Sequence, residues 1–160
     1  MTSSSNMTAP AASATSDTVF QASLTVPCEA GQVHAVREFV GKTLGDDPCP
    51  EIPVLLASEL ATNSVLHGST RLGGNMTVTV AGDPDGTIRV EVADAGGLSV
   101  PALQDGRDGW AESGRGLYLV DDLSARWGYR IEPDGGLVTW FEVRPAAGTP
   151  TAQYLDGRRS

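Results

Sequence analysis

Three polar residues interrupt a stretch of the sequence, residues 52–68, that is otherwise almost entirely apolar or small. Glu59, Asn63 and His67 follow one another at intervals of four, and four residues make just over one turn of an α-helix. A helix over this stretch would carry the three side chains as one polar stripe. Because burying a polar group without a partner costs about 1–3 kcal/mol, the carboxylate and the carboxamide require a donor or a ligand.

Two further features predict a ligand site beside that stripe. Asp94 shares the parity of Val90 and Val92 in an alternating segment, so it would end a strand on the apolar face, where a carboxylate needs a donor or a ligand. The Gly114–Gly116 stretch precedes an amphipathic segment, and a Gly-x-Gly at a helix N-terminus lets backbone N–H groups approach an anion. Singly, each feature has a structural alternative: a satisfied core amide for Asn63, a strand-end cap for Asp94, and a tight turn for the glycines. Only their order and spacing together are specific.

The hydrophobic pattern predicts the elements that position these residues. Alternation predicts strands at residues 18–26, 76–80, 87–93, 126–132 and 137–143. Helical spacing predicts helices at residues 29–44, at about 51–68 and in a short segment from Leu117 to Leu123. The strands gather in hairpins, and the helices are too few to cover both faces of a sheet. We therefore expect an α+β two-layer sandwich, with three helices on one face of a mixed, mostly antiparallel sheet of about five strands.

The length of 160 residues suits a single domain. Residues 1–17 are nearly all Ser, Thr, Ala and Asn, so a disordered N-terminal tail is predicted there, and residues 145–160 are predicted to form a flexible C-terminal tail. The folded domain is then residues 18–144. The net charge of −9 and the lack of a basic patch argue against a direct nucleic-acid partner. An acidic surface could suit a basic protein partner or simply maintain solubility.

The two cysteines, Cys28 and Cys49, are too few for a metal cluster or a disulfide framework, so free thiols in a reducing cytosol are expected. No stretch has the length and apolarity of a membrane span. The N-terminus lacks the basic and apolar regions of a signal peptide. These features predict a cytoplasmic protein without a membrane partner.

The ordered features resemble the Bergerat-fold (GHKL, histidine kinase-like) ATPases and kinases over nearly all of residues 18–143. The segment Glu59–Asn63 resembles their N box, Asp94–Gly96 their G1 box, and Ser113–Leu117 their G2 box. Within this group the sequence is most similar to the small stand-alone anti-sigma regulatory serine/threonine kinases of actinomycetes. Their N box reads E-L-x-T-N-x-x-x-H-G, as residues 59–68 do.

The resemblance implies ATP and Mg²⁺ as cofactors and a role for most of the site residues. Asp94 would accept a hydrogen bond from the adenine amine, and Gly96 would let backbone and ordered water approach the ring. Asn63 would ligate Mg²⁺ through its amide oxygen. Glu59 would be the general base that takes the proton from an attacking hydroxyl. His67 is expected to cap the helix or to pack below the site.

The G2 box is expected to bind the triphosphate. Gly114 and Gly116 would line the phosphates, the Arg115 cation would offset their charge, and Leu117 belongs to the same nucleotide-binding segment. Residues 98–113 would form the ATP lid, with their glycines as hinges.

Two functions of different classes follow. The first is an ATP- and Mg²⁺-dependent anti-sigma-type serine/threonine kinase that binds a sigma factor or similar regulator and phosphorylates a small antagonist protein. The second is a non-catalytic module that sequesters a partner, with ATP as a structural ligand or with no nucleotide. The reason for this alternative is Leu98, because the G1 box often reads D-x-G-x-G and Leu98 stands at its last position. Relatives are often homodimers, and a dimer is expected here on that ground alone.

Overall fold

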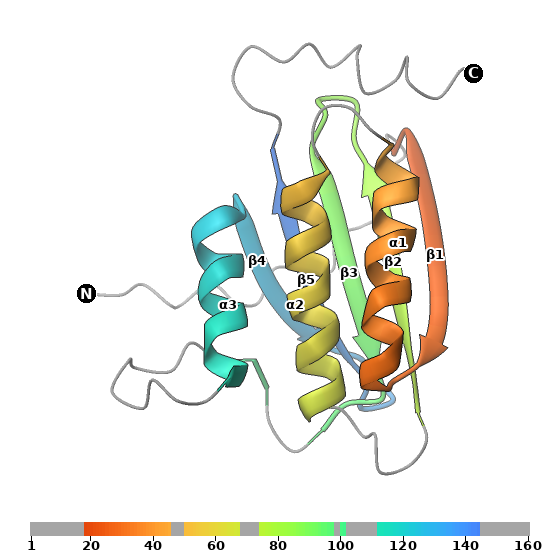
Figure 1. Cartoon of the computed structure of the whole chain (residues 1–160), viewed down its shortest axis with the longest axis vertical. Helices are drawn as coiled ribbons and strands as arrows, with labels where there is room; N and C mark the ends of the chain where they lie inside the picture. Colours follow the sequence, from red (N-terminus) through yellow and green to blue (C-terminus); the bar gives the residue numbers. More distant parts are fainter. Residues whose placement is uncertain (1–17, 46–49, 68–73, 98–99, 102–111, 145–160) are drawn as a thin grey trace.

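The computed structural model describes residues 18–45, 50–67, 74–97, 100–101 and 112–144. Within these residues five strands form one sheet, and three α-helices lie on one of its faces (Figure 1). The predicted α+β two-layer sandwich is therefore confirmed. The two predicted tails, residues 1–17 and 145–160, lie outside the described residues, as does Cys49.

Each helix and strand lies where the hydrophobic pattern predicted one. The strands are β1 (Phe20–Pro27), β2 (Asn75–Gly82), β3 (Ile88–Asp94), β4 (Arg126–Ile131) and β5 (Leu137–Val143). The helices are α1 (Val33–Leu44), α2 (Glu51–His67) and α3 (Glu112–Leu123), and a 3₁₀ turn, η1 (Ala30–Gln32), precedes α1. The prediction of one continuous helix from residue 29 was wrong, since this turn contains Gly31, a poor residue for a helix interior.

The strand order is β1-β2-β3-β5-β4, and all four pairings are antiparallel. The expectation of a mixed sheet was therefore wrong for the described strands. β3 and β4, which the α3 segment connects, do run in the same direction. However, β5 returns between them, so each of the two pairs with an antiparallel neighbour instead of with the other.

The hydrophobic core lies between the helices and the inner face of the sheet. α2 is central: it packs beside α1 and α3 and also over β3. Its Leu56 and Leu60 are almost completely buried, as are Val90 and Val92 of β3. Burying a leucine side chain is worth about 1.5–3 kcal/mol, so this contact fixes where α2 lies over the strands. None of the described helices has the length and apolarity needed to cross a membrane.

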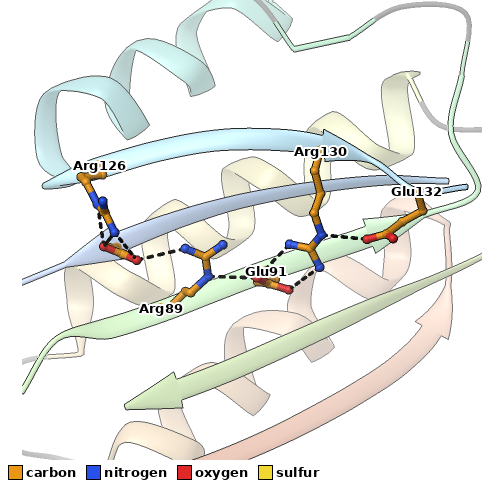
Figure 2. Close-up of polar contacts among 6 residues, drawn as sticks. Arg89, Glu91, Arg126, Arg130 and Glu132 are labelled. Atoms are coloured by element: carbon orange, nitrogen blue, oxygen red, sulfur yellow. Dashed lines mark hydrogen bonds and ion pairs between the residues drawn. The ribbon is translucent and has the colours of Figure 1, made fainter. Parts of the chain in front are cut away.

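The opposite face of the sheet carries a row of alternating charges that crosses β4, β5 and β3 (Figure 2). The row consists of Arg126, Glu142, Arg89, Glu91, Arg130 and Glu132, with N–O distances of 2.7–3.1 Å between successive partners. The Arg89 guanidinium also lies 4.0 Å from the centre of the Trp140 ring, so it covers this aromatic side chain on a face that lacks helices. The charges on this face thus satisfy one another.

Glu91 is the carboxylate on which two arginines converge. Burial raises its pKa, but the hydrogen bonds from Arg130 and Arg89 outweigh burial and hold the pKa below its usual value. A lowered folded-state pKa means that the charged form stabilises the fold at pH values above the unfolded-state pKa. This stabilisation is lost as the pH falls through the lowered folded-state pKa.

We expect Glu91→Gln to lower the free energy of unfolding at pH 7 by about 1–3 kcal/mol, since hydrogen bonds to a charged group are lost. The difference from the wild type should shrink once the pH falls below the usual carboxylate range, because the wild type then loses its own charge. Urea unfolding followed by circular dichroism at several pH values measures both effects. Glu38→Gln, at an exposed carboxylate of α1, is the control, with an expected change of less than about 0.5 kcal/mol.

Candidate functional site

The polar stripe of α2 is present in the structure. Glu59 and Asn63 are partly buried, at the border between the apolar face of the helix and its surface. Among the described residues, neither side chain has a hydrogen-bond partner. His67 is the last residue of α2 and is exposed, so it does not pack below the site as expected.

Glu59 lies directly against α3. A Cβ atom built on Gly116 would clash with Glu59 Oε2 and would lie 3.4 Å from Glu59 Cβ. Glycine therefore brings the backbone of α3 close to the carboxylate, and a larger residue at position 116 would require the end of the Glu59 side chain to move. The structure thus joins two residues that are far apart in the sequence and that were both predicted to serve the site.

The remaining G2-box residues lie in the first turns of α3. The helix begins at Glu112, so Gly114 is inside its first turn, where backbone N–H groups lack intrahelical partners. Leu117 is buried in the hydrophobic core, so its side chain does not face a ligand. The side chain of Arg115 lies outside what the structure describes, as do residues 98–99 and 102–111 of the predicted lid.

Asp94 ends β3 on the inner face of the sheet, as its parity predicted. Its Oδ1 accepts a hydrogen bond of 2.7 Å from the backbone N–H of Gly96, and Oδ2 has no partner among the described residues. Gly96 has a φ of +83°, and a Cβ there would clash with the carbonyl oxygen of Gly135. Position 96 therefore requires glycine for two reasons, the positive φ and the lack of space.

Cys28 is a buried residue that contacts α2, although nothing in the sequence pattern placed it near these residues. Its Sγ donates a hydrogen bond of 3.3 Å to the carbonyl oxygen of Ser64, the neighbour of Asn63. Burial raises the pKa of the Cys28 thiol, and the negative charge of Asp94 raises it further. The Cys28 thiol therefore contacts the backbone of α2 next to Asn63 and lies within range of the Asp94 charge.

Thr139 is a second residue that the sequence reasoning missed. It pairs with Val92 across β3 and β5, so its side chain shares the inner face with Asp94, diagonally across the two strands. Its exposure is only 6%, and its hydroxyl has no partner among the described residues. The sequence feature that could have identified Thr139 is its alternation with Phe141 in β5. This alternation puts the Thr139 hydroxyl on the apolar face of the strand. An unsatisfied buried hydroxyl beside a free carboxylate oxygen suits a bound polar ligand.

These groups suit a nucleotide better than a metal held by protein ligands alone. In the described part of the chain, no three or more His, Cys, Asp or Glu residues come together in a group that could hold a metal ion. Asn63 offers one amide oxygen, which fits a cation whose other ligands are phosphates and water. Asp94 and Thr139 offer an acceptor and a hydroxyl from the sheet below. An acceptor and a hydroxyl on the inner face of the sheet thus accompany an amide and a carboxylate on α2, the helix that packs over β3.

Comparison with known proteins supports this assignment. Residues 26–141 match the family model described as histidine kinase-like ATPase domain, which is more than half of the chain. No curated protein matches the sequence. Among solved structures, the crystal structure of the RsbU and RsbW domains of Rv1364c from Mycobacterium tuberculosis has a similar fold, with a TM-score of 0.58 at 21% identity.

That alignment covers 82% of this chain but only 35% of the mycobacterial chain, so the similarity extends over about a third of the larger protein. At 21% identity, this similarity shows a shared fold only. The family match is independent of it and spans the site from β1, which ends beside Cys28, to Phe141 of β5. The chain belongs to the histidine kinase-like ATPase domain family.

Proposed function

We propose that this protein is an ATP- and Mg²⁺-dependent serine/threonine kinase of the anti-sigma type. The observation that carries the proposal is the contact of Glu59, one helical turn before Asn63, with Gly116 of α3, in a fold where Asp94 ends β3 on the inner face of the sheet. On this proposal, an adenine acceptor, a metal ligand and a base would follow one another in the order in which a nucleotide presents its base and its phosphates.

At the base end of this path, the free Oδ2 of Asp94 would accept a hydrogen bond from the adenine amine. Guanine has no such donor at the equivalent position, so the contact selects adenine. The Gly96 N–H holds the other oxygen at 2.7 Å and thereby fixes the carboxylate plane. The Thr139 hydroxyl would form a hydrogen bond with the same edge of the adenine, directly or through a water molecule.

At the phosphate end, Asn63 would hold Mg²⁺ through its amide oxygen. The cation supplies charge neutralisation of the transferred phosphoryl group. Gly114 and Gly116 bring backbone N–H groups of α3 close to the same place. Glu59 would orient the attacking Ser or Thr hydroxyl and take its proton.

The proposed partners are a sigma factor, or a similar regulator, and a small antagonist protein that carries the phosphorylated hydroxyl. Support comes from the N-box pattern at residues 59–68 and from the fold shared with a chain that contains an RsbW domain. The cytoplasm is the proposed location. A homodimer, which the resemblance led us to expect, remains a proposal.

The first test is Asp94→Asn. This change keeps an oxygen for the Gly96 N–H but replaces the second carboxylate oxygen, an acceptor, by the N–H₂ group of an amide, a donor. We expect the affinity for ATP to fall at least tenfold, about 1.4 kcal/mol, because two donors would then face each other. Isothermal titration with ATP and Mg²⁺ measures the change. Asp122→Asn, an exposed carboxylate on α3, is the control and should leave the affinity within twofold.

Absence of binding heat for the wild type, with no effect of Asp94→Asn, would contradict the nucleotide site. It would favour the alternative of a nucleotide-independent module that sequesters its partner. Leu98, in place of the final glycine of the G1 pattern D-x-G-x-G, is the residue that favours this alternative.

The second test is Glu59→Gln, which has nearly the same size and so preserves the fit against Gly116. We expect phosphotransfer to a cognate antagonist to fall by about 10²–10⁴-fold, because the base is lost. The affinity for ATP should change less than threefold, since Glu59 acts on the attacking hydroxyl. Transfer from labelled ATP, alongside titration calorimetry, separates the two effects. Unchanged transfer by Glu59→Gln would show that another group is the base.

A further inference from the structure

Four exposed apolar side chains lie along the line where α2 meets α3. They account for four of the nine large apolar residues that are exposed in the described part of the chain. Their exposed fractions are 41% for Ile52, 38% for Leu55, 37% for Leu119 and 40% for Leu123. We call these four residues the α2–α3 seam.

Helix geometry places the four residues together. The two seam residues of α2 precede Glu59 by four and seven positions, and the two of α3 follow Gly116 by three and seven. Such spacings put each pair on the same side of its helix as the reference residue. Glu59 and Gly116 are in contact, and Figure 1 shows α2 and α3 running in opposite directions. Leu55 therefore lies level with Leu119, and Ile52 with Leu123.

The seam thus begins at the candidate base and continues away from it. Seven helical residues span about 10 Å, so the apolar strip has the length of two helical turns. This length matches a partner helix that presents anchors at positions i, i+3 or i+4, and i+7.

Among the side chains that the structure describes on α2 and α3, those with a fixed charge are all negative. α2 carries Glu51 and Glu59 and has no Lys or Arg. Among the described side chains of α3, Asp121 and Asp122 are the charged ones, and both are exposed. Asp121 accepts a hydrogen bond of 2.9 Å from the indole of Trp127 on β4, which leaves Asp122 to face an approaching partner.

We propose that the α2–α3 seam binds a basic amphipathic helix of a separate protein. The apolar strip would receive its apolar anchors, and the acidic residues on both helices would pair with its Lys or Arg side chains. A second copy of this chain fits poorly, because two acidic seams would repel each other and the whole chain has a net charge of −9. One step rests on the proposed function. If Glu59 is the base, a protein bound at the seam would have a segment next to Glu59, where a Ser or Thr hydroxyl of that segment could be phosphorylated.

The probe for the test is a synthetic helical peptide of Leu and Lys, with Leu at positions i, i+3, i+4 and i+7. Its controls are a peptide of the same composition in scrambled order and one with Glu in place of Lys. Binding is measured by fluorescence anisotropy with the full chain and no nucleotide. Amide chemical shifts in NMR spectra identify the residues affected.

We expect the patterned peptide to bind and both control peptides to bind at least tenfold more weakly. Leu55→Ser and Leu119→Ser should each weaken binding at least fivefold. Both side chains are already more than a third exposed, so the fold should tolerate these changes, which thermal unfolding checks. The matched apolar control is Ile131→Ser, since Ile131 is 63% exposed on β4 and lies outside the seam.

Two charge-reversal variants distinguish an effect of charge beside the seam from an effect of the net charge of the chain. Asp122→Lys and Glu38→Lys change the net charge equally, but only the first lies beside the seam. We expect Asp122→Lys to weaken binding at least threefold more than Glu38→Lys does. If both variants weakened peptide binding equally, or if the scrambled peptide bound as tightly as the patterned one, the interaction would depend on net charge alone. Either result would overturn the proposal.

Other occupants give distinct results. A concentration-dependent dimer that Leu119→Ser abolishes would assign the seam to a second copy. Stronger peptide binding after removal of residues 145–160 would assign it to the chain's own C-terminal segment. Either result would overturn the proposal. Because the peptide is tested without nucleotide, loss of seam binding and loss of ATP binding by Asp94→Asn are separate outcomes, and either hypothesis can fail alone.

Discussion

The packing of α2 on β3 is the contact on which the rest of the structure depends. α2 is the central helix, and its apolar face meets the valine row of β3 through Leu56 and Leu60. Once this face is buried, the rotation of the helix is set. Glu59 and Asn63 then lie at the border of the buried face, toward α3 and the end of β3, and cannot turn away without exposing the leucines.

The same burial makes the polar groups of the site costly to leave without a ligand. Asp94 and Thr139 lie on the inner face of the sheet, where each neighbouring inward residue of β3 and β5 is apolar or small. Among the described residues, Asp94 has one donor, the Gly96 N–H, and neither its second oxygen nor the Thr139 hydroxyl has a partner. The fold thus accepts a local loss of stability at the place where a nucleotide would restore the missing hydrogen bonds.

The two faces of the molecule differ in how many of their charged and apolar side chains already have partners within the fold. On the outer face of the sheet, the alternating arginines and glutamates pair with one another, and Arg89 covers Trp140. On the helical face, the seam between α2 and α3 leaves apolar side chains exposed beside Glu51 and Asp122, for which no ion pair is seen among the described residues. A surface whose groups already have partners gains little from binding another protein. The helical face, next to Glu59, is therefore the better surface for recognition.

The sequence by itself determined the elements, the inward parity of Asp94, and the spacing that puts Glu59 and Asn63 on one side of a helix. These follow from periods of two and 3.6 residues, which depend only on local backbone geometry. Only the tertiary structure decided that Gly116 meets Glu59, that the Gly135 carbonyl fills the space beside Gly96, that Cys28 contacts α2, and that Thr139 shares the inner face with Asp94. It also decided that β5 lies between β3 and β4. These contacts join residues distant in the chain, and they depend on how the layers pack, which no local period records.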